Sequence, residues 1–302
     1  MKKLIIAGGS GFLGKEIATY FASKFTDIVI LTRGATEIKN GCRYVTWDGK
    51  TLGPWKEEFT SCEVLINMAG RSVDCRYTPE NKKLIMDSRV DATKILGEVI
   101  SKSKHPPKVW INSSTATIYR HALNQEMTEE TGEIGTGFSV TVAKAWEKAF
   151  YASTTPNTRK VALRTSIVLA THGGALVPIV KLAKIGFGGT QGKGNQLFSW
   201  IHINDFLESI NFIIKNDHLI GAVNCVAPEP VTNAILMKSI RKQLNIPFGI
   251  PLPKFLLEIG AKIIQTETEL ILKSRNVLPQ KLTEAGFKFK YTTIESALKE
   301  LI

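Results

Sequence analysis

The residues whose spacing most clearly suggests chemistry lie at the start of the chain, where a short apolar run meets a cluster of glycines. Gly9, Gly11 and Gly14 fit the G-x-G-x-x-G spacing of loops that bind dinucleotides. Glycines at these positions let the backbone turn tightly, approach a pyrophosphate closely and pack the next helix onto the strand. The start of that helix offers free N–H groups and a positive dipole end to phosphates. The predicted cofactor contacts of this turn are Gly8, Gly9, Ser10, Gly11, Phe12, Leu13 and Gly14.

Two other interpretations of the same turn are open. Residues 9–15 read G-x-x-x-x-G-K, which is close to a mononucleotide P-loop, but Glu16 stands where that loop needs a hydroxyl for magnesium. A carboxylate at that position would repel phosphates, so the P-loop is disfavoured. The remaining alternative is a strand-to-helix turn that binds no ligand.

The end of the next predicted strand, residues 27–32, indicates which dinucleotide is bound. In an NAD site an acidic residue lies about 20 residues beyond the glycines and binds the ribose hydroxyls. This chain has Thr32 and Arg33 there instead. A guanidinium suits a 2′-phosphate, so the pair predicts NADP (NADPH). The alternative for Arg33 is a solvated arginine in a turn.

The remaining predicted contacts with the cofactor lie mostly at the ends of other strands, expected over residues 43–48, 63–68, 109–112 and 160–170. In open α/β sheets ligands bind beyond the carboxyl ends of the strands. The residues assigned to the cofactor there are Asp48, Asn67, Met68, Ala69, Gly70, Ser113 and Arg164.

Alternation of strands and helices predicts an α/β fold, a doubly wound parallel sheet of the Rossmann type. Thr78 and Pro79 suit the N-cap and first position of a helix that runs to about residue 104. A second helix is expected over residues 138–152, and a third begins with Asn204 as its N-cap. We expect a Rossmann domain over residues 1–170 with a late strand near 222–226. A smaller, mainly helical substrate lobe is expected over residues 171–302, with a glycine-rich loop at 186–194.

Composition bounds the class of protein. The 302 residues are 43% hydrophobic and 22% charged, as in an ordinary globular protein, and no apolar run approaches the length of a membrane span. The apolar part of the N-terminus is too short for a secretory signal. The net charge of +12 is spread thinly, which suits an anionic cofactor or substrate and does not predict nucleic-acid or membrane partners. Four scattered cysteines and five scattered histidines predict reduced thiols, a cytoplasmic location and no metal.

With these residues in place, the chain resembles the extended short-chain dehydrogenase/reductase superfamily. It is most similar to the atypical, nucleoside-diphosphate-sugar epimerase-like branch that includes the "epimerase family protein" group. The resemblance covers nearly the whole chain and implies a Rossmann domain, NADP(H) on the glycine turn and a C-terminal substrate lobe. The segments that carry it are residues 8–14, 66–70, 88–90, 146–147, 164–165, 173–176, 199–202, 224, 227–232, 278–279 and 285–287.

The chain departs from the superfamily at the catalytic pair. Superfamily enzymes use Tyr-x-x-x-Lys, in which the lysine and the cofactor lower the tyrosine pKa so that it can transfer a proton. Counting back from Glu147 puts Ala143 at the lysine position and Ser139 at the tyrosine position. Only Tyr20 and Lys24 have the required spacing, and they belong to the first helix, so we predict a structural role for that pair.

Other residues are candidates for the missing functions. We predict Ser114 and Tyr119 as the catalytic groups that orient the substrate oxygen, because both follow a central strand. Tyr119 is equally well explained as the anchor of a loop, and Lys144 as a solvated helix residue. The predicted substrate contacts are Arg71, Trp200 and His202, against the alternatives of a surface arginine and a buried core histidine.

These residues lead to one expected function and one alternative. The expected function is an NADP(H)-dependent oxidoreductase or epimerase-like enzyme for a small polar substrate, such as a nucleotide sugar. The alternative is a non-catalytic NADPH-binding regulatory module, which the missing catalytic pair motivates. A homodimer formed through the helices at 79–104 and 138–152 is expected by analogy.

Overall fold

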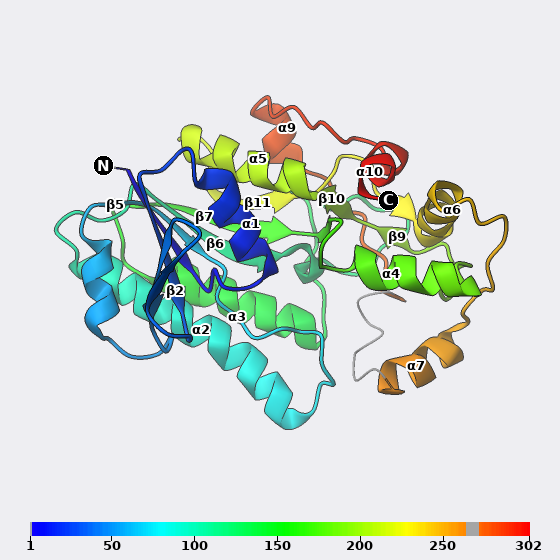
Figure 1. Ribbon diagram of the computed structural model, residues 1–302, viewed down its shortest axis with the longest axis horizontal. Coiled ribbons are helices and arrows are strands. Elements are labelled where there is room, and N and C mark those ends of the chain that lie inside the picture. The colour runs from blue at the N-terminus through cyan, green and yellow to red at the C-terminus, as the bar shows by residue number, and fades with distance from the viewer. Residues whose placement is uncertain (1, 264–271) are drawn as a thin grey trace.

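The computed structural model describes residues 2–263 and 272–302, which form a large sheet flanked by helices and a smaller lobe beside it (Figure 1). Neighbouring strands of the large sheet are parallel except β3 and β4, which are antiparallel. This is the doubly wound Rossmann-type architecture that the sequence predicts. In spatial order the strands are β11 (Gly221–Cys225), β7 (Arg159–Thr165), β6 (Val109–Thr115), β5 (Cys62–Asn67), β1 (Lys3–Ala7), β2 (Asp27–Thr32), β4 (Cys42–Thr46) and β3 (Glu37–Lys39).

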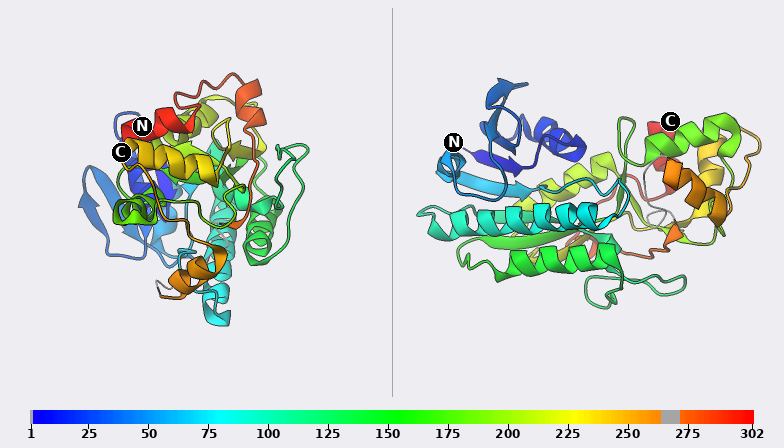
Figure 2. Two further views of the ribbon diagram at one scale, coloured as in Figure 1. Left: turned by 90° about the vertical axis from the view of Figure 1, so that its right-hand side faces the viewer. Right: turned by 90° about the horizontal axis from the view of Figure 1, so that it is seen from below.

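Both faces of the sheet are covered by helices. Leu4 and Ile6 of β1 pack into the core under α1 (Phe12–Phe21) and α5 (Ile203–Lys215). Ile5 and Ala7 pack into a second core under α2 (Pro79–Lys102) and α3 (Phe138–Ala152), which run side by side (Figure 2). Strands buried on both faces read as continuous apolar runs, which explains why β1 and β2 are so clear in the sequence.

Of the three helices whose starts were predicted, two begin where expected, and one of these, α2, has the predicted cap. The Thr78 hydroxyl accepts a hydrogen bond from the Asn81 N–H at 3.2 Å, and Pro79 is the first helical residue, as predicted for α2. Helix α3 also has the predicted bounds. The prediction of Asn204 as an N-cap is wrong: α5 begins at Ile203, and His202 is the cap because its Nδ1 accepts a hydrogen bond from the Asn204 N–H.

Two strand predictions need correction. The chain over residues 160–170 is not one strand, because it breaks at Ser166 between β7 and β8 (Ile167–Leu169). Strand β8 leaves the large sheet and pairs with β10 (Trp200–His202) in a separate two-stranded sheet. Strand β3 was not predicted, because its three residues are all exposed and therefore carry no apolar pattern.

The lobe has a core of its own, to which α4 (Leu176–Leu182), α6 (Asn233–Gln243) and α10 (Ile294–Leu301) contribute. These helices lie at the end of the molecule remote from the N-terminus (Figure 1). The second half of the chain also contributes α5, α9 (Gln280–Glu284) and β11 to the Rossmann part. The remaining elements are η1 (Pro54–Phe59), η2 (Ala116–Ile118), η3 (Ala183–Phe187), β9 (Leu197–Phe198), β12 (Val231–Thr232) and α7 (Lys254–Ile263).

Candidate functional site

The glycine turn between β1 and α1 is tight at Gly8 and Gly14 and open at Gly11. Gly8 has φ +72°, and a Cβ there would lie 2.6 Å from the Cα of Ala69. A Cβ on Gly14 would lie 2.4 Å from the Cα of Gly9, so the helix packs directly on the turn. A Cβ on Gly11 would meet nothing within 4 Å. This is the pattern of a turn whose middle glycine faces a ligand.

The start of α1 is available to an anion. Gly11 is its N-cap and supplies no side-chain hydrogen bond to the helix, and the first turn contains no acidic residue. The first N–H groups of the helix therefore have no side-chain cap, and the positive end of the dipole is uncompensated. A helix start of this kind fits a pyrophosphate.

A pocket of about 430 Å³ lies beside the turn, between α1 and the strands β2, β3 and β4. Thr32 and Gly34 line it on either side of Arg33, whose side chain is exposed. Sequence reasoning missed Lys15 and Lys39, which also line the pocket and make it suitable for a phosphate. A lysine in the turn at the start of α1 was visible in the sequence, whereas Lys39 lies on the unpredicted strand β3. The full lining is Ser10, Lys15, Ala18, Thr19, Thr32, Gly34, Ala35, Glu37, Lys39, Asn40, Cys42 and Tyr44.

The turn after β5 is held by hydrogen bonds of a buried side chain, that of Asn67. The Asn67 amide is fully buried and donates to Asn112 Oδ1 at 2.7 Å and to Thr93 Oγ1 at 3.2 Å. Its Oδ1 accepts a hydrogen bond from the Ala69 N–H at 3.0 Å. The Asn67 side chain therefore holds the turn in place, and Gly70 is the exposed residue of the turn.

The Asp48 side chain likewise stabilises the turn in which it lies. Its carboxylate accepts hydrogen bonds from the Thr51 hydroxyl at 2.6 Å and from the N–H groups of Lys50 and Thr51 at 2.8 and 2.9 Å. The Thr51 hydroxyl is the largest cause of a pKa for Asp48 below its usual value. All of these partners belong to the chain, so the structure shows Asp48 in a turn and not in a contact with the pocket.

Ser114, Tyr119 and Arg164 come together in a closed buried network. Ser114 Oγ donates to Glu147 Oε1 at 2.6 Å, and Arg164 makes two hydrogen bonds to the same carboxylate at 2.8 Å. Arg164 Nη1 also donates to the Tyr119 hydroxyl at 2.8 Å, which in turn donates to Asn224 Oδ1 at 2.9 Å. Burial raises the pKa of Tyr119 above its ordinary value.

This network corrects the predicted geometry of the catalytic residues. Tyr119 is 1% exposed and Ser114 4%, and both hydroxyls are hydrogen-bonded to other residues of the chain. The reason is that β6 runs to Thr115, beyond its predicted end, and successive strand residues face opposite sides. Ser114 therefore faces α3, whereas Ser113 and Thr115 face the other side and stay partly exposed. Thr115 was not among the predicted residues, although the alternation along the strand indicates it.

The positions of the superfamily's catalytic pair fall at the start of α3. Ser139 lies in the first turn, and Ala143 is fully buried. Lys144 is exposed to solvent on the same helix. Tyr20 and Lys24 lie at the end of α1, with Lys24 Nζ 3.7 Å from the Tyr20 ring centroid, which agrees with the structural role predicted for them.

Trp200 and His202, two of the predicted substrate contacts, lie in the interior of this structure, so neither side chain is exposed to a ligand here. The Trp200 side chain is fully buried, and its indole N–H donates to the Glu229 carbonyl at 3.0 Å. The His202 ring stacks on Tyr291 with centroids 3.7 Å apart, and burial lowers its pKa to about 4. The third predicted substrate contact, Arg71, is exposed and donates to Asn81 Oδ1 at 3.1 Å.

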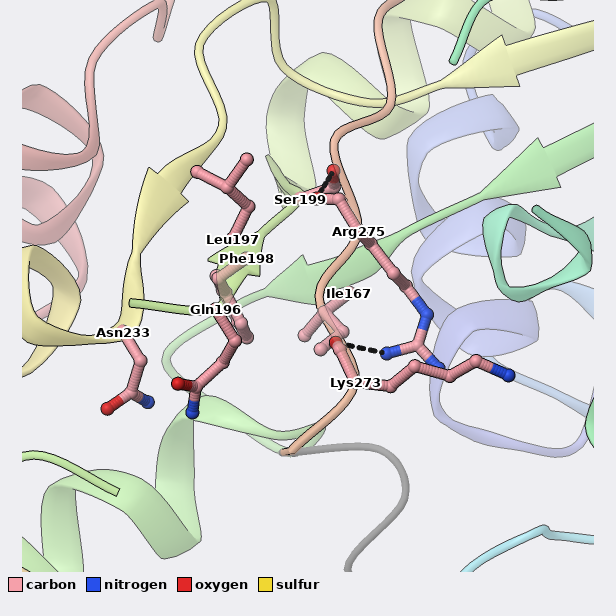
Figure 3. A pocket seen from close by; sticks show the side chains of 8 residues that line it. All are labelled: Ile167, Gln196, Leu197, Phe198, Ser199, Asn233, Lys273 and Arg275. Atoms are coloured by element: carbon pink, nitrogen blue, oxygen red, sulfur yellow. Dashed lines mark hydrogen bonds between the residues drawn. The ribbon is translucent and has the colours of Figure 1, made fainter. Parts of the chain in front are cut away.

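Figure 3 shows a second, much smaller pocket, which residues of β8 and β9 and the segment around Lys273 and Arg275 line. Arg275 donates to the Lys273 carbonyl, and Ser199 donates to the Arg275 carbonyl, so the backbone there is held by its own neighbours (Figure 3). Its volume of about 10 Å³ admits a single water and no substrate. The lining is Ile167, Gln196, Leu197, Phe198, Ser199, Asn233, Lys273 and Arg275.

Within residues 2–263 and 272–302, three or more metal-binding side chains do not gather anywhere. The helices placed there include none that is long and apolar enough to cross a membrane.

A parallel sheet with a glycine turn at its first strand, an uncapped helix start and an adjoining pocket lined by two lysines is typical of the Rossmann-type dinucleotide-binding fold. The chain belongs to the NAD dependent epimerase/dehydratase family, whose sequence profile matches residues 4–225. A second profile, for a domain of unknown function (DUF1731), matches residues 252–301.

Known proteins resemble the chain over its whole length. The epimerase family protein YfhF of Bacillus subtilis is 33% identical over 301 residues, which are 99% of this chain and 97% of that protein. The crystal structure of human epimerase family protein SDR39U1 with NADPH is 25% identical, with a TM-score of 0.86 over 99% of this chain and 98% of that one. The nucleoside-diphosphate sugar epimerase of Corynebacterium glutamicum is 28% identical, with a TM-score of 0.79 over 99% of this chain and 58% of that one.

Proposed function

We propose that the chain is an NADP(H)-dependent oxidoreductase or epimerase-like enzyme that acts on a small polar substrate. The observation that carries the proposal is the glycine turn, which is open at Gly11, uncapped at α1 and continuous with a pocket that Lys15 lines. Arg33 stands between two residues of that pocket and would bind the 2′-phosphate. NADPH in the human relative supports this choice of cofactor.

The bound cofactor would supply hydride chemistry, and the chain would hold and orient the reactants. Ser113 and Thr115 carry hydroxyls on the side of β6 opposite the closed network, so we assign the orientation of the substrate oxygen to them in place of Ser114. The Thr115 and Thr117 hydroxyls are hydrogen-bonded to each other at 2.8 Å. The name of the Corynebacterium relative supports a nucleotide sugar as the substrate class.

A non-catalytic NADPH-binding module is the second candidate, and a specific observation favours it. The side chains that could replace the missing pair, Tyr119 and Ser114, are bound within the protein, and the lysine position is the buried Ala143. Free cysteines in the described part of the chain are compatible with a cytoplasmic location for either function. The homodimer through α2 and α3 stays a prediction.

Calorimetry with NADPH and NADH tests the proposed cofactor. We expect the wild-type chain to prefer NADPH, and Arg33→Ala to weaken NADPH binding about tenfold, or about 1.4 kcal/mol, without changing NADH binding. Lys56→Ala is the matched control, since Lys56 is an exposed cation that does not line the pocket. A preference for NADH would refute the role of Arg33, and binding of neither nucleotide would refute the proposal.

Turnover separates the two candidate functions. The absorbance of NADPH is followed with a panel of carbonyl compounds and sugar nucleotides. Consumption with any of them supports the enzyme. Tight NADPH binding without consumption, together with a protein partner whose binding depends on NADPH, supports the module.

A further inference from the structure

Arg89, in α2, holds its guanidinium against the turn that follows β5. A Cβ built on Gly70 would lie 2.9 Å from Arg89 Cζ, so the guanidinium and the glycine backbone are in close contact. The same group lies over the Trp146 ring of α3, with Cζ 5.1 Å from the ring centroid. The cation is therefore fixed where α2, α3 and the turn of residues 67–70 meet.

The protein provides hydrogen-bond acceptors for only some of the N–H groups of this guanidinium. Nη1 donates to the carbonyl groups of Arg71 and Ile85, each at 3.0 Å. Among the described residues, Nε and Nη2 have no hydrogen-bond partner and no carboxylate pairs with the group. A guanidinium carries five N–H donors, so three of them remain for a ligand.

The surroundings of Arg89 make the missing counterion costly. Burial lowers the pKa of its guanidinium to about 10. Two other partly buried arginines of the chain have acidic partners: Arg43 pairs with Asp27 and Glu58, and Arg164 pairs with Glu147. Arg89 is partly buried, and a cation there without an acidic partner is less favourable than a paired one, so the negative charge of a ligand would supply the missing partner.

We propose that Arg89 binds an anionic phosphate oxygen of the ligand that passes over Gly70. This extends the proposed function, on which it rests, because it gives the ligand a second anchor away from the glycine turn. Ala143, the position where the superfamily has its lysine, lies one turn before Trp146 on α3. The positive charge that the superfamily places on α3 would then come from the facing helix α2.

The experiment measures the affinity of three probes for the wild-type chain and for Arg89→Met by calorimetry. NADPH contains the whole cofactor, 2′,5′-ADP contains only its adenosine side, and UDP stands for the phosphates of a nucleotide-sugar substrate. We expect Arg89→Met to weaken NADPH or UDP at least tenfold and to leave 2′,5′-ADP unchanged. Arg89→Lys should recover part of the loss, because it restores the charge but not the planar fork.

Lys82→Met is the matched control. Lys82 is an exposed cation on the same helix, with Nζ 5.4 Å from the Phe138 ring centroid, so it shares the helix and an aromatic neighbour but not the turn. All three affinities should be unchanged in this variant. If Arg89→Met does not fold, Arg89→Gln replaces it, since an amide can still donate to the Arg71 carbonyl.

The outcomes are distinct. Loss of NADPH affinity assigns the oxygen to the cofactor, and loss of UDP affinity alone assigns it to the substrate. Unchanged affinities for both probes in a folded variant overturn the proposal, as does an equal loss for 2′,5′-ADP with a lower melting temperature, which would make Arg89 a structural brace. A wild-type chain that binds none of the probes would refute the proposed function itself.

Discussion

The two polar regions at the carboxyl edge of the sheet differ in what they leave unsatisfied. At the glycine turn, the start of α1 has no side-chain cap, and the space at Gly11 is empty of protein. At the ends of β6 and β7, Ser114, Glu147 and Arg164 are hydrogen-bonded to one another within the protein. The first region has N–H groups that a ligand could bind, whereas the polar side chains of the second are already hydrogen-bonded to one another.

This difference shows which part of a site can be inferred from residue types. A glycine pattern specifies backbone conformation, and the free N–H groups follow from it. A serine at a strand end specifies only that a hydroxyl is present, and the neighbouring helix decides whether that hydroxyl reaches a ligand. For this chain the glycine turn could therefore be inferred from the sequence. Which hydroxyls at the end of β6 reach a substrate depends on which residues face away from α3.

The largest expected change in stability comes from removing the cation of the buried network around Glu147. Arg164→Met leaves the buried Glu147 carboxylate without its cation, and we expect the free energy of unfolding to fall by about 3–5 kcal/mol. Urea unfolding measures it, and the variant's NADPH affinity, measured where it is folded, should be close to that of the wild-type chain.

The control for that variant is Arg120→Met, which breaks the more exposed ion pair with Glu133. Exposed pairs contribute about 1 kcal/mol or less, so this change should be small. Equal losses in the two variants would contradict the view that the network around Glu147 is a buried, self-contained element.

The fold was largely predictable because its central strands are buried on both faces and the long helix α2 has a clear start signal at Thr78 and Pro79. The break at Ser166 was not, since apolar residues lie on both sides of it and only the pairing of β8 with β10 separates β8 from β7. Side-chain contacts were harder still. Ser114 and Thr115 look equivalent in the sequence, and the face that each occupies depends on how far β6 extends.

His202 provides the next prediction, because it is another polar group that the protein encloses. Its pKa is about 6.5 in an unfolded chain and is lowered by burial to about 4. As the pH falls from about 6.5 to 4, the unfolded chain binds a proton that the folded chain excludes, so stability is lost on acidification. The full loss is about 3 kcal/mol.

Comparison with His202→Asn isolates this contribution. Asparagine retains an oxygen that can cap α5 but has no titratable ring. Asp205, whose pKa burial raises to about 6, makes an opposite contribution in both proteins, which therefore cancels in the difference. Urea unfolding at pH 7 and pH 4 measures the effect, and identical pH dependence in the two proteins would contradict the enclosed state of His202.

The smallest effect tests the open region. A methyl group at Gly11 has no protein atom within 4 Å, and φ of −75° is accessible to alanine, so Gly11→Ala should change the free energy of unfolding by about 1 kcal/mol or less. The same methyl group would occupy the space through which a pyrophosphate approaches the N–H groups of α1. We expect NADPH affinity to fall about tenfold, or about 1.4 kcal/mol, in calorimetry.

Gly14→Ala is the contrast, because its Cβ would lie 2.4 Å from the Gly9 Cα, and it should lose stability and binding together. Unchanged NADPH affinity in Gly11→Ala would mean that the open space at the turn is not where the nucleotide binds.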